Sequence, residues 1–248
     1  MKIHVFAQRN VKEVLRDPVN LLFGLGFPLV LLALLSTINA SIPPEANNPV
    51  FEIGNLAPGL AMFGTVFMAL FAGTLLAKDR TSSFLMRLFA SPMTALDFLI
   101  GYTAPMLIMT LAQTAITLIA ACLFGLPATA NILPAILMTA LMSFLFIGVG
   151  LLCGSLMNDR AVGGICGALL TNVAGWLSGV FIPADLIGGA FQTATHFLPF
   201  YHSVQAIKAA LNGEAAAIPR HIGIVFAYAA IVYLAAVLAF RMKMNGDK

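Results

Sequence analysis

The chain has 248 residues, of which 60% are hydrophobic and only 9% are charged, and its mean hydropathy is +0.96. A soluble globular domain carries about 25% charged residues, so the composition excludes a water-soluble fold and indicates a chain surrounded by lipid. The formal net charge of +3 is small and reflects membrane orientation, as the placement of Lys and Arg shows below, rather than a nucleic-acid-binding patch.

Residues 1–20 predict an amphipathic helix that lies on the membrane surface. The apolar residues of this segment fall near one face of a helix: Ile3, Phe6, Val11, Val14 and Leu15. Arg9, Lys12 and Arg16 are available to lipid headgroups, and Asp17-Pro18 ends the pattern. An apolar stripe opposite basic residues is typical of an interfacial helix.

Six apolar runs are long enough to cross a membrane, because a hydrocarbon core about 30 Å thick needs roughly 20 residues of helix. The runs are residues 21–38, 56–77, 98–124, 132–157, 161–182 and 221–240. They are continuously apolar rather than alternating, which favours spanning helices over β-strands. The sequence therefore predicts an all-α polytopic membrane protein with a single transmembrane domain over residues 1–248 and no separate soluble domain.

The basic residues are distributed asymmetrically across the predicted spans. With both termini on one side, that side receives 11 of the 13 Lys and Arg residues, and Lys208 and Arg220 fall on the other side. Because Lys and Arg are enriched in cytoplasmic segments, this distribution predicts that both termini are cytoplasmic.

Residues 78–97 lie between the second and third spans and combine charge with apolar side chains. Phe84, Leu85, Leu88 and Phe89 form an apolar face. Arg80 and Arg87 flank this face, and Pro92 ends the helix. The segment predicts a short cytoplasmic helix with an exposed apolar face. Passive contact with lipid is the alternative to a docking role.

Two patterns stand out inside the predicted spans: a line of polar residues in the third span and a stripe of small residues in the fifth. The third span places Thr110, Gln113, Thr114 and Thr117 on one face, which should point inward for interhelical hydrogen bonding or as a substrate-lining surface. The fifth span has a small residue at every fourth position: Gly163, Gly167, Thr171, Gly175 and Gly179. Such a stripe indicates close helix contact, within one subunit or between two. Asn172 and Trp176 lie beside it.

Residues 183–220 contain two apolar pieces, near 185–198 and 200–211, that are too short to cross and are separated by Pro199. We expect interfacial or re-entrant helices on the outer side here, and a plain loop is the alternative.

The sequence contains no motif for nucleotide binding, metal binding or proton-coupled transport. The chain contains no G-x-x-x-x-G-K-[ST] motif for nucleotide phosphates. His4, His196, His202 and His221 have no metal-ligand spacing, and Cys122, Cys153 and Cys166 are best explained as small packing residues. The predicted spans carry no Asp, Glu, Lys or Arg in their interiors, which disfavours a proton-driven transporter. We therefore expect no catalytic residue and no metal site, and any energy for transport should come from another protein.

Two segments resemble the ABC-2 family of ATP-binding-cassette exporter permeases. After the second span, Asp79-Arg80, Leu88-Phe89, Pro92, Gly101 and Pro105 follow the family pattern, whereas Ser83 and Met86 depart from it. After the fifth span, Gly179, Phe181, Pro183, Pro199 and Tyr201 resemble the family's second motif, without its usual asparagine. The layout is similar throughout: about 250 residues, six spans and an N-terminal surface helix.

The resemblance implies a transmembrane subunit that works with a second permease copy, expected to form a homodimer, and with two separate ATPase subunits that hold ATP and Mg²⁺. It implies that residues 78–97 couple the permease to the ATPase through Asp79, Arg80, Phe84, Leu85, Arg87, Leu88, Phe89 and Pro92. It also implies a substrate cavity between the two copies, which we expect to be lined by Thr65, Met68, Thr171, Asn172, Gly175 and Trp176.

The expected function is export of an amphipathic or hydrophobic substrate across the cell's inner membrane. A sodium-coupled secondary transporter and a non-transporting membrane scaffold remain the alternatives at this point.

Overall fold

The computed structural model describes residues 2–43, 49–82, 84 and 93–246. The chain is 86% helical, and the described residues contain no strand. The first part of the chain, up to Thr81, forms α1 (Lys2–Leu15), α2 (Pro18–Leu21), a π-helix (Leu22–Gly26), α3 (Phe27–Ser41), a 3₁₀ turn (Pro49–Phe51) and α4 (Ile53–Thr81). They are followed by α6 (Ala95–Leu123), α7 (Ile132–Leu156), α8 (Asp159–Val162), a second π-helix (Gly163–Leu169), α9 (Leu170–Leu177), α10 (Ala184–Ile187), α11 (Gly189–Phe197), α12 (Pro199–Asn212) and α13 (Ile218–Gly246).

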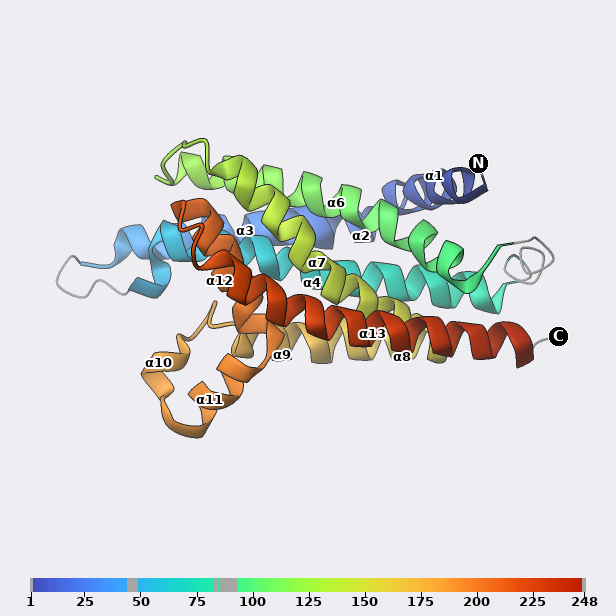
Figure 1. Cartoon of the computed structure of the whole chain (residues 1–248). Helices are drawn as coiled ribbons and strands as arrows, with labels where there is room; N and C mark the ends of the chain where they lie inside the picture. Colours follow the sequence, from blue (N-terminus) through green and yellow to red (C-terminus); the bar gives the residue numbers. More distant parts are fainter. Residues whose placement is uncertain (1, 44–48, 83, 85–92, 247–248) are drawn as a thin grey trace.

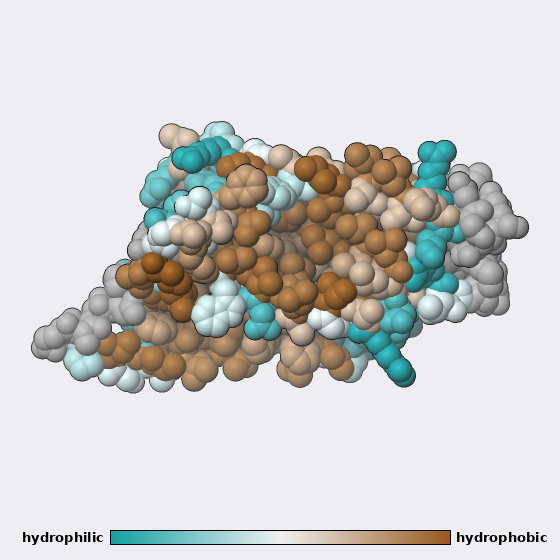
Figure 2. Space-filling model, turned by 90° about the horizontal axis from the view of Figure 1, so that it is seen from below, coloured by the Kyte–Doolittle hydropathy of each residue, from teal (hydrophilic) through white to brown (hydrophobic). Residues whose placement is uncertain are grey.

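Among the residues that the structure describes, five helical segments are long and apolar enough to cross a membrane: Pro18–Ser41, Ile53–Thr81, Ala95–Leu123, Ile132–Leu156 and Ile218–Lys243. They run along one bundle, and both chain termini lie at the same end of it (Figure 1). Figure 2 shows hydrophobic side chains across the middle of the surface and hydrophilic ones toward its two ends. An all-α polytopic membrane fold is thereby confirmed.

The segment predicted as the fifth span differs from the other five. It is helical from Asp159 to Leu177, but as three consecutive pieces, α8, the second π-helix and α9. This segment is not among the five helices that meet the criteria of length and apolar composition. Its charged start and its many glycines lower its hydropathy, so a span at residues 161–182 stays a prediction.

Helix α4 is the centre of the bundle and packs against α3, α6, α7, α9 and α12. Its closest neighbour is α7, where three glycines allow the two backbones to touch. A Cβ on Gly73 would lie 2.7 Å from the carbonyl oxygen of Gly150, and one on Gly154 would lie 2.5 Å from that of Gly73. A Cβ on Gly150 would overlap the carbonyl of Ala69. The α4–α7 crossing therefore depends on the absence of side chains at these three positions.

Helix α1 packs on the protein rather than lying on lipid alone. Phe6, Asn10 and Val14 are buried, mainly against α6, whereas Leu15 of the predicted apolar face is 52% exposed. The Phe6 ring lies edge-on to Phe98 and Tyr102, with centroids 5.7 and 5.0 Å away. The expected surface helix is present, and a large part of its apolar face serves to dock it onto α6.

The region 183–220 is helical rather than a plain loop. Helices α10 and α11 lie at the end of the bundle away from the termini (Figure 1). Helix α12 packs deeply, with Ser203, Ala206 and Ile207 fully buried among α4, α7 and α13. Helices α10 and α11 thus lie at the end of the bundle and α12 lies within it, and the expectation of interfacial or re-entrant helices over residues 183–220 stays a prediction.

Two histidines join α12 to α13 at this end. The Nδ1 atoms of His202 and His221 lie 2.8 Å apart, and His202 Nε2 donates to the carbonyl oxygen of His196 at 2.8 Å. One bridging proton suffices for the Nδ1–Nδ1 contact, so the pair holds at most one positive charge. Arg220 adds a further positive charge beside it. Acidification that places a positive charge on both histidines should therefore break this contact.

We expect the melting temperature of the protein to decrease as the pH is lowered, and we expect part of this decrease to depend on His202. Burial lowers the pKa of His202 below its ordinary value of 6.5, although the hydrogen bond to His196 opposes the shift. A group with a lowered folded pKa stabilises the fold fully above about pH 6.5, and that contribution is lost as the pH falls through the folded pKa. Melting temperatures measured in detergent from pH 8 to pH 5 test this. His202→Gln should flatten the decline, and an unchanged decline would contradict the assignment.

Candidate functional site

A buried carboxylate joins three helices at the end of the bundle that carries the termini. Asp79, on the last turn of α4, is 3% exposed. Arg9 of α1 donates to both of its oxygens, at 2.5 Å to Oδ2 and 2.8 Å to Oδ1, and the Tyr102 hydroxyl of α6 donates to Oδ2 at 2.8 Å. Bidentate, charge-assisted bonds of this kind are strong and fix relative orientation. We call Arg9, Asp79 and Tyr102 the junction triad.

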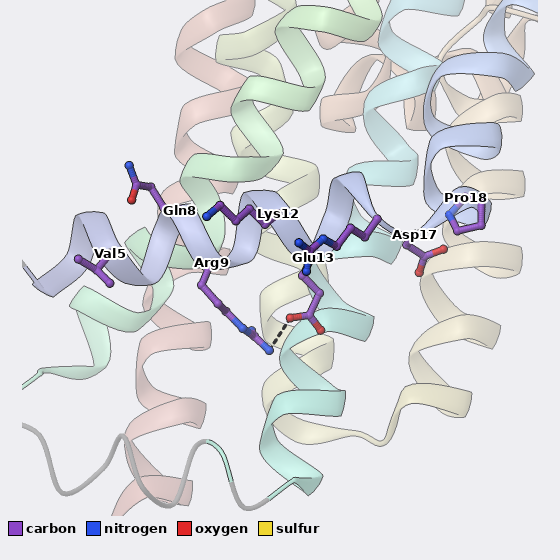
Figure 3. Close-up of a pocket in the computed structure, with 8 residues that line it drawn as sticks. Val5, Gln8, Arg9, Lys12, Glu13, Asp17 and Pro18 are labelled. Atoms are coloured by element: carbon purple, nitrogen blue, oxygen red, sulfur yellow. Dashed lines mark ion pairs between the residues drawn. The ribbon is translucent and has the colours of Figure 1, made fainter.

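Further contacts hold α1 at the triad. The Asn10 amide is fully buried, donates to the carbonyl oxygen of Gly101 at 3.1 Å and accepts from Arg9 at 2.8 Å. Gly101 allows α1 to approach α6 closely, because a Cβ at this position would overlap the Phe6 ring. Arg9 also pairs with Glu13 at 2.5 Å, the ion pair drawn in Figure 3. Burial alone would lower the pKa of Arg9, but its bonds and charge interactions with Asp79 and Glu13 raise it, so the guanidinium remains charged.

Arg80, the next residue after Asp79, ties α4 to the end of α7. Its guanidinium donates to the carbonyl oxygens of Ser155 and Met157, the latter at 2.7 Å. These carbonyls belong to the C-terminal end of α7, where a cation satisfies unpaired acceptors and interacts favourably with the helix dipole. Consecutive residues at the end of α4 therefore anchor it to α1 and α6 on one side and to α7 on the other.

The segment predicted to couple to an ATPase begins at this junction. Phe84 is half-buried, and its ring lies 4.4 Å from the Arg9 guanidinium carbon and 6.4 Å from the Phe6 ring. The other predicted coupling residues, Leu85, Arg87, Leu88, Phe89 and Pro92, lie outside the described residues. Asp79 and Arg80, predicted from the sequence as coupling contacts, have side chains that face neighbouring helices of the same chain.

An open groove runs along the polar side of α1, with a volume of about 800 Å³. Its lining carries charges of both signs: Arg9, Lys12, Glu13, Arg16 and Asp17 (Figure 3). Lys12 and Arg16 are exposed. In Figure 3, Arg9 and Glu13 extend from α1 toward the end of α4, whereas Gln8 extends away from it. Such a groove suits contact with a charged protein surface or with headgroups, and it contains no arrangement suited to covalent catalysis.

The residues predicted to line a substrate cavity separate into two groups. On α9, Asn172 is exposed and donates to the carbonyl oxygen of Ala168 at 2.8 Å, and Trp176 is 52% exposed. Thr171 is half-buried and Gly175 is buried. On α4, Thr65 and Met68 are fully buried within the subunit. The exposed face of α9 thus presents Asn172 and Trp176, and the structure does not bring Thr65 and Met68 to it.

The small-residue stripe does not form one continuous packing face in this chain. A Cβ on Gly163 would meet no neighbour within 4 Å, and one on Gly167 would lie 3.4 Å from the Leu70 side chain, an ordinary contact. Gly175 packs tightly against Phe181 and Phe63, and Gly179 lies beyond α9 with φ +78°. The π-helix at Gly163–Leu169 shifts the register of the four-residue repeat.

The polar line of the third span faces inward as predicted. Thr110, Gln113, Thr114 and Thr117 are all fully buried on α6. Gln113 donates to Thr117 at 3.2 Å and accepts from Thr114 at 3.3 Å, and its amide packs where Gly64 of α4 has no side chain. The contacts favour helix packing over a substrate-lining role.

Sequence reasoning missed the partners that make these contacts. Arg9 and Tyr102 are far from Asp79 in the sequence, and nothing in their spacing indicates the triad. The α4–α7 crossing did leave a signal, because Gly150 and Gly154 form a G-x-x-x-G pattern of the kind that mediates close helix packing.

Comparison with known proteins supports an assignment to a transporter family. The family model described as ABC-2 type transporter matches residues 1–212. No curated protein matched the chain. The match includes α1, the junction triad and the helices through α12. Together with five apolar helices of membrane-spanning length, this shows a multi-pass membrane permease component of an ABC transporter. The chain belongs to the ABC-2 type transporter family.

Proposed function

We propose that the chain is the membrane subunit of an ABC exporter and moves an amphipathic or hydrophobic substrate outward across the cytoplasmic (inner) membrane. A separate ATPase would supply the energy, with ATP and Mg²⁺ bound to that subunit. ABC-2 permease domains generally work with an ABC ATPase, often as dimers, and we propose a homodimer with two ATPase copies. Both termini would lie in the cytoplasm, consistent with the strong excess of Lys and Arg at that end.

The observation that carries this proposal is the junction triad at the start of the predicted coupling segment. A force applied to residues 78–97 acts first on the end of α4. There Asp79 is bonded to α1 and α6, and Arg80 is bonded to the end of α7. A displacement of the segment would therefore move four helices together rather than bend one. A passive surface helix would have no need for such anchoring.

The exposed face of α9 is the proposed contribution of this subunit to a cavity between two copies. Asn172 retains one amide hydrogen and a carbonyl oxygen beyond its bond to Ala168. Exposing an amide to hydrocarbon is costly. A partner subunit or a water-filled cavity beside α9 would remove that cost, whereas lipid would not. Asn172 and Trp176 are thus the proposed substrate contacts.

Pull-down of the ATPase by tagged permease tests the proposal. Replacing both Leu88 and Phe89 with alanine should abolish ATPase retention, because fully burying each such side chain stabilises an interface by about 1.5–3 kcal/mol. Arg87→Ala is the matched control, since an exposed ion pair contributes only about 0–1 kcal/mol. The double variant should remain inserted, because neither residue belongs to a span.

Each outcome separates the candidate functions. Retention of the ATPase by the wild type and by Arg87→Ala, with loss by the double variant, supports the exporter. Full retention by the double variant would show that the segment merely rests on lipid. Absence of any ATPase from the wild-type preparation, with transport that depends on sodium, would favour the secondary transporter. Absence of both an ATPase and transport would favour a scaffold.

A further inference from the structure

A small polar pocket lies at the end of the bundle away from the termini. It has a volume of about 240 Å³ and lies among the start of α4, the turn after α9 and α12. Among the residues that the structure describes, its polar lining consists of Asn55, Ser178, Tyr201, Gln205 and Lys208, with no carboxylate. The pocket is separate from the junction triad and from the exposed face of α9 at Asn172.

Lys208 brings a positive charge to this pocket. Its Nζ donates to the amide oxygen of Asn55 at 2.6 Å. Within the described ranges, no carboxylate forms an ion pair with Lys208. An ammonium group has three donors, so two remain after the bond to Asn55. The side chain is half-buried, which reduces the water available to satisfy them.

Gln205 adds further donors on the same face of α12. It precedes Lys208 by three residues, so both side chains lie on one side of the helix. Its amide is half-buried and has no hydrogen-bond partner among the residues that the structure describes. Ser178 is different, because its hydroxyl already donates to Gly175 and accepts from the Val180 amide. The unused polar atoms are thus mainly donors, at Lys208 and Gln205.

The pocket also adjoins the positive end of a long helix. Asn55 lies in the first turn of α4, whose dipole favours negative charge near that turn. Lys208, Gln205 and the start of α4 all favour an acceptor with negative charge. A phosphate or a carboxylate meets this requirement, and lysine binds phosphate as a point charge.

The size of the pocket limits what can enter it. Pockets for drug-sized ligands have volumes of about 300–1,000 Å³, so 240 Å³ accommodates a headgroup rather than a whole amphiphile. Val50, Val180 and Val204 supply apolar lining beside the polar atoms. Shortly after Pro183 in the chain, Leu186 and Ile187 are 73% and 52% exposed. Large exposed apolar side chains of this kind suit contact with an acyl chain.

We propose that this pocket binds the anionic headgroup, phosphate or carboxylate, of an amphipathic molecule. Lys208 and Gln205 hold the headgroup, and the apolar tail remains outside the pocket. The headgroup can belong to a resident membrane lipid or to a transported amphiphile, and the two sources share the same chemistry.

Binding can be measured directly by isothermal titration calorimetry. The probe is octyl phosphate, added to the purified full-length protein in uncharged detergent, and octyl glucoside is the uncharged control. We expect saturable binding of octyl phosphate alone. Lys208→Gln should weaken it at least about tenfold, the effect of losing a hydrogen bond to a charged group. Lys208→Arg should restore most of it, because the charge returns.

Arg220→Gln is the matched control variant, since Arg220 is the other basic residue predicted for this side, is exposed and does not line the pocket. It should leave binding unchanged. Gln205→Leu provides a second test that retains Lys208 and its bond to Asn55. Melting temperatures of all variants show whether they remain folded. Binding that is equal in wild type, Lys208→Gln and Gln205→Leu would overturn the proposal, as would the absence of saturable binding.

Nanodiscs distinguish the two sources. If a lipid occupies the pocket, nanodiscs that contain phosphatidylglycerol should block octyl phosphate, and nanodiscs of phosphatidylcholine alone should not. If the occupant is a transported amphiphile, octyl phosphate should bind equally in both. The binding assay uses neither ATP nor transport, so a negative result would leave the proposed exporter function intact. Likewise, a negative ATPase pull-down would leave the proposed headgroup site intact.

Discussion

Asp79→Asn is expected to lower the free energy of unfolding by about 3 kcal/mol and to uncouple the permease from the proposed ATPase partner. Breaking a buried ion pair by removing one partner costs about 3–5 kcal/mol. The lower value applies here because the Arg9 side chain is 33% exposed and keeps its bond to Glu13. Melting temperature in detergent measures the loss of stability, and ATP hydrolysis stimulated by the permease measures coupling.

A double-mutant cycle isolates the ion pair from its surroundings. Arg9→Gln combined with Asp79→Asn should be less destabilising than the sum of the two single changes, because neither charge is then left without its partner. Arg9→Lys should fall between the wild type and Arg9→Gln, since lysine retains the charge and loses the bidentate geometry. Strictly additive effects of the two single variants would show that the contact contributes nothing to stability.

Gly150→Ala should be the most damaging single-methyl substitution in the bundle. The added Cβ would overlap the backbone carbonyl of Ala69, which cannot rotate away as a side chain can. Helices α4 and α7 would have to separate, and overpacking of this kind costs about 1–3 kcal/mol or more. Because α4 is the central helix, its other contacts would be disturbed as well. We expect a lowered melting temperature and a reduced yield of inserted protein.

Gly163→Ala is the matched control, because a Cβ there would meet no neighbour within 4 Å. Alanine has a better helix propensity than glycine, so this variant should be neutral or slightly stabilised. Gly167→Ala should resemble it, since the new methyl group would make only an ordinary contact with Leu70. A melting temperature of Gly150→Ala equal to that of Gly163→Ala would refute the close approach of α4 and α7.

The spanning helices could be predicted from sequence because a span is a local property of composition. The inward face of α6 was also predictable, since the spacing of Gln113 and Thr117 places both on one side of any α-helix. The junction triad was not predictable in this way, because Arg9 and Asp79 are 70 residues apart and each has an ordinary local explanation. An arginine on an amphipathic helix suits lipid headgroups, and a carboxylate after a span suits a loop.

The glycines illustrate the same limit. The four-residue repeat from Gly163 to Gly179 assumes α-helical geometry throughout, and the π-helix at Gly163–Leu169 breaks that assumption. The shorter pattern at Gly150 and Gly154 lies within a regular α-helix, and its face packs against α4. Residue type indicates that a close contact is possible, whereas its location depends on local helix geometry and on which helices are neighbours.

The docking of α1 has a consequence for the order in which the protein is made. Asn10 leaves the ribosome 91 residues before Gly101, its hydrogen-bond partner. At about 5–20 residues per second, translation of this interval takes about 5–20 s. Helix α1 must therefore wait at the membrane surface until α4 and α6 have been inserted. Its amphipathic pattern suits this delay, because the membrane interface can shelter Phe6 and Val14 until their final partners arrive.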